Sequence, residues 1–147
     1  MYRSIGILRK LKYTIPQSSL MLLYNSLIYP YLLYCSIIWG ANSIYKLNPI
    51  LILQKKAVRI IANADFRAHS SPLFTKYKLL KVVEISQFQV AVFMFKFSIG
   101  QLPTKFNSYF IRTTSIHQYS TRSSLYGYVI PFVRTSVAKR KLNTSVL

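Results

Sequence analysis

The feature that most constrains this chain is its longest run without charge, residues 13–45, which contain no Asp, Glu, Lys or Arg. A run of this length has room for a transmembrane helix of about 20 apolar residues. However, Pro16 and Pro30 interrupt it, and Asn25 and Ser26 would lie near the bilayer centre. Because proline lacks an N–H and clashes with the preceding turn, a helix must kink or stop at Pro30. The run therefore predicts shorter buried helices, and an anchor over residues 17–39 is kept as the alternative hypothesis.

The charge balance gives the second constraint. The 147 residues hold 20 Lys and Arg against two acids, Asp65 and Glu84, so the net charge is +18. Few folded domains carry such a charge without a polyanionic partner, which is either nucleic acid or anionic lipid. With 52% hydrophobic and 15% aromatic residues, the chain lacks the composition of a basic disordered protein. We therefore expect one folded domain that presents its cations to a polyanion.

Cysteine usage and the N-terminal sequence bear on the compartment. Cys35 is the single cysteine of the sequence, so no internal disulfide can form, and a lone thiol fits a reducing compartment. The opening residues place Arg9, Lys10 and Lys12 after a short apolar run, which is the reverse of a signal peptide. We expect an intracellular protein, nuclear or cytoplasmic, that is not secreted and is not held in a membrane.

Start and stop signals for helices predict an all-α fold over about residues 1–110. Asn48 followed by Pro49 is read as an N-cap and first helical residue, and Ser71 followed by Pro72 is read in the same way. Gly100 and Pro103 are expected to end the last helix. The predicted helices cover about residues 2–13, 17–29, 30–39, 49–62, a short segment from 72, and 82–98. Residues 111–147 are expected to form an extended or poorly ordered basic tail.

The helix predicted over residues 49–62 has one apolar face and one basic face. Lys55 and Arg59 lie four residues apart with Lys56 beside them, so these cations cannot neutralise one another and must face solvent or an anion. Four aromatic residues alternate with Leu and Ile at helical spacing: Tyr24, Tyr31, Tyr34 and Trp39. We expect these aromatic side chains to belong to the core rather than to stack on bases.

The residues needed for catalysis or metal binding are scarce. Phosphoryl or nucleotidyl transfer with two metal ions requires converging carboxylates, whereas Asp65 and Glu84 lie on different predicted elements. His69, His117 and Cys35 have spacings unlike those of any compact zinc motif. We therefore expect no catalytic, cofactor-binding or metal-binding residues in this chain.

Five segments in this order carry a family resemblance: LLYNSLIYPYLLYCSIIWG, LQKKAVRII, RAHSSPLF, FMFKFSIGQLP and HQYSTR. They resemble the region downstream of the catalytic palm in reverse transcriptases of non-LTR, jockey-like retrotransposons. The likeness covers about residues 5–134. The matching positions are Leu23, Tyr24, Leu27, Pro30, Tyr34, Cys35, Trp39, Gly40, Leu53, Gln54, Lys55, Ala57, Arg59, Ile61, Arg67, His69, Pro72, Leu73, Phe74, Met94, Lys96, Pro103, His117, Tyr119, Thr121 and Arg122.

The resemblance implies a polymerase thumb, a small helical bundle that follows the palm and holds the template–primer duplex. The parent family is an RNA-directed DNA polymerase, a nucleotidyltransferase, whose palm carries a Tyr-x-Asp-Asp turn. No Asp-Asp pair occurs in this sequence. We therefore expect a fragment that lacks the palm and fingers and is inactive alone, with Mg²⁺ required only in the missing palm.

The expected partners are RNA, DNA or an RNA/DNA hybrid, together with the missing palm and fingers. Binding would be independent of sequence, because Lys and Arg neutralise backbone phosphates and release condensed counterions. The candidate nucleic-acid-binding residues are Lys55, Lys56, Arg59, Arg67, Lys76, Lys78 and Lys81.

Overall fold

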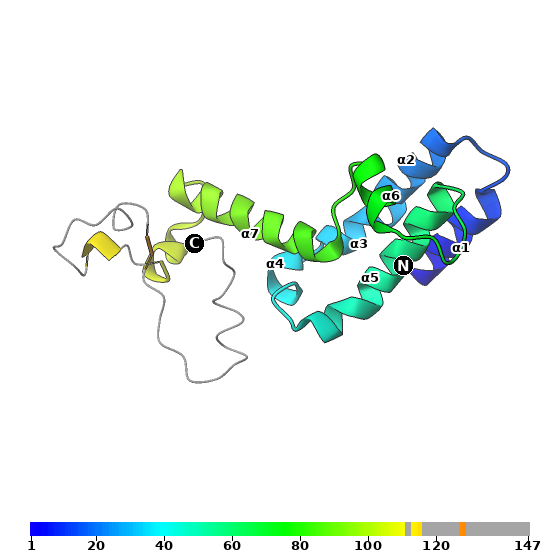
Figure 1. Cartoon of the computed structure of the whole chain (residues 1–147). Helices are drawn as coiled ribbons and strands as arrows, with labels where there is room; N and C mark the ends of the chain where they lie inside the picture. Colours follow the sequence, from blue (N-terminus) through cyan, green and yellow to red (C-terminus); the bar gives the residue numbers. More distant parts are fainter. Residues whose placement is uncertain (111–112, 116–126, 129–147) are drawn as a thin grey trace. The chain divides into compact units, whose positions relative to one another are not determined.

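The computed structural model of the chain describes residues 1–110, 113–115 and 127–128. The chain forms two compact units, Met1–Gln89 (unit 1) and Val90–Leu147 (unit 2). The regular structure of the described residues is helical (Figure 1), which confirms the predicted all-α fold. The predicted domain boundary at residue 110 stays a prediction, and the predicted tail lies almost entirely outside the described residues.

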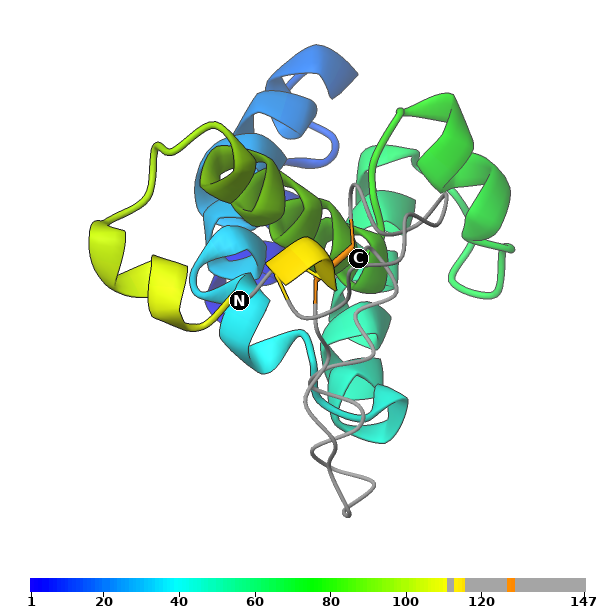
Figure 2. The ribbon, with the colours of Figure 1, turned by 90° about the vertical axis from the view of Figure 1, so that its left-hand side faces the viewer.

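Unit 1 is a helical bundle in which α5 is the central element. α5 packs against α1, α2 and α6, and α2 also packs against α1 and α3. A second view shows α6 again beside α5 (Figure 2). The core includes Leu8, Tyr24, Ile28, Ala57 and Ile61, all at most 1% exposed. The helices are α1 (Tyr2–Leu11), α2 (Gln17–Leu27), α3 (Tyr29–Leu33), α4 (Ser36–Trp39), α5 (Ile44–Ile61), α6 (Ser71–Lys76) and α7 (Val82–Ser98), of which α7 continues into unit 2.

The long uncharged run folds into three separate helices. The break near Pro30 is confirmed, because α2 ends at Leu27 and α3 starts at Tyr29. The prediction of one helix from Pro30 to Trp39 is wrong: Cys35 has a left-handed backbone with φ 51°, which separates α3 from α4. Trp39 bridges this break by donating its indole N–H to the carbonyl of Tyr34 at 2.6 Å. None of the helices in the described ranges is long and apolar enough to cross a membrane.

The start of α5 differs from the prediction. The helix begins at Ile44 and contains Pro49, so Asn48 is not its N-cap. Proline inside a helix removes one backbone hydrogen bond and clashes with the preceding turn, which together cost about 3 kcal/mol. The additional N-terminal turn buries Leu47, which is 4% exposed, and full burial of a leucine contributes about 1.5–3 kcal/mol, which offsets much of this cost. Tertiary packing therefore extends the helix past the local start signal.

Three helices in the described part of the chain end in the same hydrogen-bonding motif, each on a different residue. After α7, Gly100 has φ 70°, and the N–H groups of Gly100 and Gln101 donate to the carbonyls of Phe97 and Lys96. This is a Schellman motif, so the predicted stop at Gly100 is confirmed. Asn63 takes the equivalent position after α5 with φ 50°, and Lys78 does so after α6 with φ 52°. This conformation costs a non-glycine residue about 1 kcal/mol or more.

A buried glutamine joins four segments of unit 1. The Gln54 side chain is fully buried, and its Nε2 donates to the Tyr24 hydroxyl at 3.0 Å and to the Leu80 carbonyl at 2.8 Å. Its Oε1 accepts the N–H of Val82 at 2.9 Å, which is the first residue of α7. This one amide therefore connects α5 to α2, to the segment before α7 and to the N-terminus of α7.

Unit 2 contains the C-terminal part of α7, the 3₁₀ helices η1 (Thr104–Ser108) and η2 (Thr113–Ser115), and residues 127–128. Its centre is an aromatic cluster. The Phe93 ring lies 5.5 Å from Phe106, and Phe97 lies 4.8 Å from Phe110 and 5.7 Å from Tyr128. These separations are typical of favourable aromatic pairs.

Replacement of Gln54 tests the buried amide. We expect Gln54→Leu to lower the free energy of unfolding by at least about 2 kcal/mol, because each buried polar group left without a partner costs about 1–3 kcal/mol. Tyr24→Phe removes the hydroxyl and breaks only one of these bonds, so it should cost about 1 kcal/mol. Urea denaturation measures both values. An equal decrease in the free energy of unfolding for Gln54→Leu and Tyr24→Phe would contradict the role assigned to Gln54.

The Tyr24 hydroxyl should make stability fall at alkaline pH. Burial raises its pKa above the ordinary value of 10.0, with a further rise from Tyr29 and a partial offset by the hydrogen bond from Gln54. Above pH 10 the unfolded chain loses this proton while the folded chain keeps it, so the unfolding free energy decreases as the pH rises. Tyr24→Phe should show a smaller decrease above pH 10 in urea titrations. Identical pH profiles would show that the raised pKa has no energetic consequence.

Candidate nucleic-acid interface

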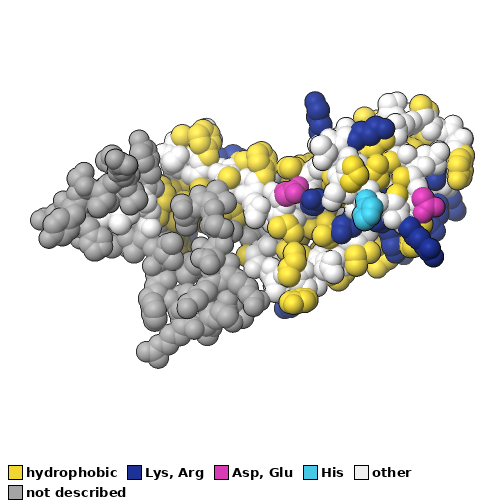
Figure 3. Space-filling model, in the orientation of Figure 1, with side chains coloured by type: hydrophobic (Ala, Val, Ile, Leu, Met, Phe, Trp, Pro, Cys, Tyr) yellow, Lys and Arg dark blue, Asp and Glu magenta, His cyan; other side chains and the backbone are white. Residues whose placement is uncertain are grey.

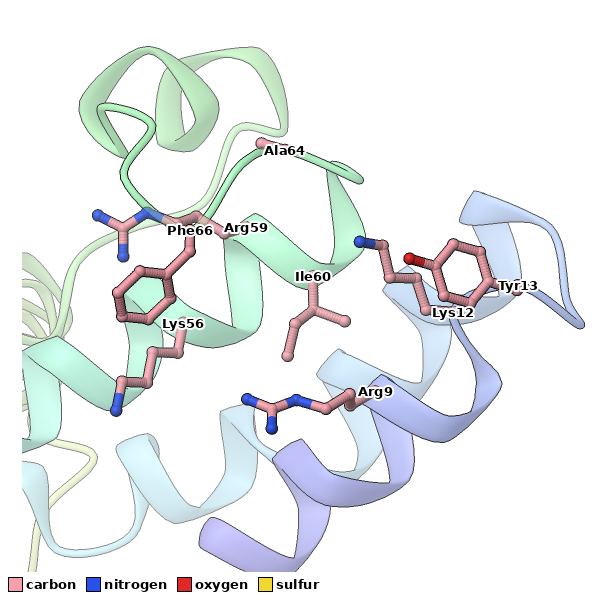
Figure 4. A pocket seen from close by; sticks show the side chains of 8 residues that line it. All are labelled: Arg9, Lys12, Tyr13, Lys56, Arg59, Ile60, Ala64 and Phe66. Carbon is pink, nitrogen blue, oxygen red and sulfur yellow. The ribbon is translucent and has the colours of Figure 1, made fainter.

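A basic pocket of about 290 Å³ lies between the C-terminal end of α1, α5 and the loop after α5. Four cations line it: Arg9 and Lys12 come from α1 and its C-cap, and Lys56 and Arg59 come from α5 (Figure 4). The Arg9 side chain extends from α1 toward α5 in this view. The remaining lining residues are Tyr13, Ile60, Ala64 and Phe66.

The amphipathic pattern of the two helices explains why the cations meet. Arg9 and Lys12 are three residues apart, as are Lys56 and Arg59, and residues at this spacing share a helix face. The adjoining face of each helix is buried, with Leu8 on α1 and Ala57 on α5 both fully inaccessible. Packing α1 against α5 therefore places two basic pairs on either side of one seam.

No carboxylate lines the basic pocket. Within the described ranges, the ion pair is Lys81–Glu84 at 3.6 Å, which involves none of the pocket residues. Asp65 lies in the loop after α5, but its Oδ1 accepts the backbone N–H of Arg67 at 2.7 Å. On the visible face of unit 1, Lys and Arg side chains are spread over the end that holds α1, α5 and α6 (Figure 3). A bound anion would relieve the mutual repulsion of the pocket cations.

Arg59 is the pocket cation held by a side-chain hydrogen bond. Its Nε donates to the carbonyl of Ala68 at 2.8 Å, which ties α5 to the loop that carries Phe66. A guanidinium has five N–H donors, so this bond fixes its orientation and leaves the two terminal nitrogens for an anion. Near the other end of the pocket, Lys12 Nζ lies 5.1 Å from the centroid of the Tyr13 ring.

The structure separates the predicted binding residues into different places. Lys56 and Arg59 line the basic pocket, whereas Lys55 is half-buried and does not. Arg67 is exposed in the loop after α5. The other candidates lie outside the pocket: Lys76 stands over the Tyr77 ring, Lys78 follows the C-cap of α6, and Lys81 pairs with Glu84. Whether these residues bind nucleic acid stays a prediction.

Sequence reasoning missed half of the pocket cations. The sequence marks Arg9 and Lys12 only as cations that follow a short apolar run, and neither is among the predicted binding residues. Their spacing of three residues signals a shared face, but nothing in the sequence indicates that this face meets α5. Phe66 carries no sequence signal either, since its place beside the cations depends on the turn after α5.

Both acidic side chains have local structural roles. Glu84 is the third residue of α7, and its Oε2 accepts the backbone N–H of Lys81 at 2.8 Å, as in a capping box. Asp65 stabilises the turn at Arg67. In the part of the chain that the structure describes, no three His, Cys, Asp or Glu side chains gather into a group that could hold a metal ion. His117 lies outside the described residues.

Comparison of this chain with protein-family models, with curated proteins and with solved structures finds no match.

Inorganic pyrophosphate provides a direct test of the basic pocket. Millimolar pyrophosphate should raise the melting temperature, because a ligand that binds only the folded state stabilises it. Arg9→Gln with Lys56→Gln should abolish most of the rise. Lys10→Gln with Lys46→Gln removes the same charge from exposed positions outside the pocket and is the matched control. If the rise in melting temperature falls equally in the two double variants, pyrophosphate stabilises the protein through its net charge and not by binding at this pocket.

Proposed function

We propose that this chain binds template–primer nucleic acid, which is RNA, DNA or their hybrid, without sequence preference. In this proposal it is the thumb-like region of a non-LTR, jockey-like retrotransposon reverse transcriptase, and the palm and fingers are its intramolecular partners. The observation that carries the proposal is the basic pocket, in which four cations meet without a lining carboxylate. The five segments that resemble this family and the net charge of +18 support the same conclusion.

The mechanism of binding is neutralisation of phosphates. A nucleic-acid backbone that enters the basic pocket replaces its condensed counterions with Arg9, Lys12, Lys56 and Arg59, and the released ions supply the favourable free energy. Phosphate contacts position the strand and carry no sequence information. The proposed thumb therefore holds any template–primer that the polymerase is copying.

The proposal assigns no chemical step to this chain. Nucleotidyl transfer needs paired carboxylates that hold metal ions, and Asp65 and Glu84 are each engaged in local backbone hydrogen bonds. Polymerisation and its Mg²⁺ belong, in this proposal, to the palm of the parent enzyme. The contribution of this chain is affinity for the substrate duplex.

The salt dependence of binding tests this proposal. Each neutralised phosphate contributes about −0.9 to the slope of log affinity against log salt on duplex DNA. Arg9→Gln with Lys56→Gln should therefore make the slope shallower by up to about 2, and affinity should fall alike for unrelated sequences. Fluorescence anisotropy with two labelled duplexes of different sequence, at several salt concentrations, measures both quantities.

The matched control is Lys10→Gln with Lys46→Gln, which changes the net charge equally at exposed positions away from the basic pocket. Its slope should stay closer to that of the unmodified protein. The proposed function is refuted if the unmodified protein binds neither duplex at low salt. A strong preference for one duplex sequence would refute the claim of sequence-independent binding.

A further inference from the structure

A second hollow of about 180 Å³ adjoins the basic pocket along the seam between α1 and α5. It is lined by Tyr2, Ile5, Gly6, Arg9, Leu53 and Lys56. Arg9 and Lys56 also line the basic pocket, so the two hollows meet at these cations. We name the two hollows together the α1–α5 seam. From Tyr2 to Lys12 it follows about 15 Å of helix at 1.5 Å per residue.

Gly6 keeps the second hollow open. A Cβ built on Gly6 would have no atom within 4 Å, so the absent side chain faces free space. Glycine inside a helix costs about 1 kcal/mol relative to alanine, and no turn or positive φ requires glycine at this position of α1. Nearby, Ile5 and Leu53 give the hollow an apolar floor.

Each of the two hollows of the α1–α5 seam is lined by an exposed aromatic ring, and Figure 4 shows the ring of Phe66 next to Lys56. Tyr2 is 75% exposed beside the second hollow, and Phe66 is 73% exposed beside the basic pocket. Neither ring is therefore part of the buried core. Exposed aromatic rings next to cations are the combination that binds unpaired nucleotides, in which the rings stack on bases and the cations contact phosphates.

We propose that the α1–α5 seam is a track for single-stranded nucleic acid. Arg9 and Lys56 contact the backbone phosphates where the two hollows meet, Tyr2 stacks on an unpaired base at the second hollow, and Phe66 stacks on another at the basic pocket. This inference rests on the proposed function and deepens it, because it keeps the phosphate contacts and assigns an unpaired part of the template–primer to this surface.

The chemistry of the seam favours a single strand. The phosphates of a duplex and of a single strand can both reach the cations that line the two hollows, so the aromatic rings make the difference. Bases in a duplex are already stacked and paired, so their faces cannot lie on Tyr2 or Phe66. Stacking on an aromatic side chain contributes about 1–3 kcal/mol per base and tolerates every base.

The first part of the test compares labelled oligo-dT with a labelled DNA hairpin duplex of the same length. Tyr2→Leu and Phe66→Leu each remove one ring but keep an apolar side chain at an exposed position, so folding should be unaffected. Each variant should weaken the binding of oligo-dT about fivefold or more, because one stacked base is lost. Its binding of the duplex should change less than about twofold, which is the small effect expected of an exposed substitution.

The second part of the test blocks the seam at Gly6. Gly6→Leu places a side chain in the second hollow with no clash at its Cβ, and leucine is a good helix former. It should weaken binding of oligo-dT by the amount lost with one stacked base, about fivefold or more. Gly6→Ala is the matched control: it also removes the glycine, but its single methyl group leaves the hollow open, so oligo-dT binding should be retained.

The outcomes separate the two proposals. If the protein binds neither probe, the proposed function fails together with this inference. If it binds both probes but the three leucine variants weaken oligo-dT no more than the duplex, the track is refuted and the proposed phosphate binding stands. Selective loss of oligo-dT binding in these variants, with Gly6→Ala unchanged, establishes the track.

Discussion

The amide of Gln54 is the interaction on which the rest of unit 1 depends. α5 is the central helix, and this one side chain connects it to Tyr24 on α2, to the Leu80 carbonyl and to the first N–H of α7. A neutral amide suits this position because it both donates and accepts, whereas a charged side chain would have to be desolvated without a counter-charge. The orientation of α5 fixed in this way decides which of its faces reaches α1 and which reaches solvent.

The excess of cations is accommodated by segregation and not by neutralisation. Helices α1 and α5 bury their apolar faces against each other and leave Arg9, Lys12, Lys56 and Arg59 at the edges of the contact. Both carboxylates are used to hold local backbone turns. Positive charge therefore gathers at a seam that also carries exposed aromatic rings, which is why nucleic acid is the partner we propose.

Several elements were predictable because their signals act over a few residues. Gly100 ends α7 since its positive φ is accessible to glycine without strain, and Pro30 forces a break because a proline cannot complete the preceding helix turn. The start of α5 and the break at Cys35 were not predicted. Burial of Leu47 overrides the local signal at Asn48, and no residue type marks the left-handed backbone of Cys35. Helical spacing also predicted that Tyr24, Tyr31 and Tyr34 all belong to the core, yet only Tyr24 of these three tyrosines is buried.

The sequence by itself determined the helical class, most helix ends and the surplus of positive charge, because propensity, proline, glycine and net charge are properties of single residues or of near neighbours. Only the tertiary structure decided that Arg9 and Lys12 meet Lys56 and Arg59, that Phe66 stands beside them, and that Gly6 opens a hollow along the same seam. These groups are brought together by the packing of α1 on α5, two helices that are separated by 32 residues in the chain. Contacts at such separation leave no periodic signal in the chain, because they depend on the angle and register at which two buried faces fit.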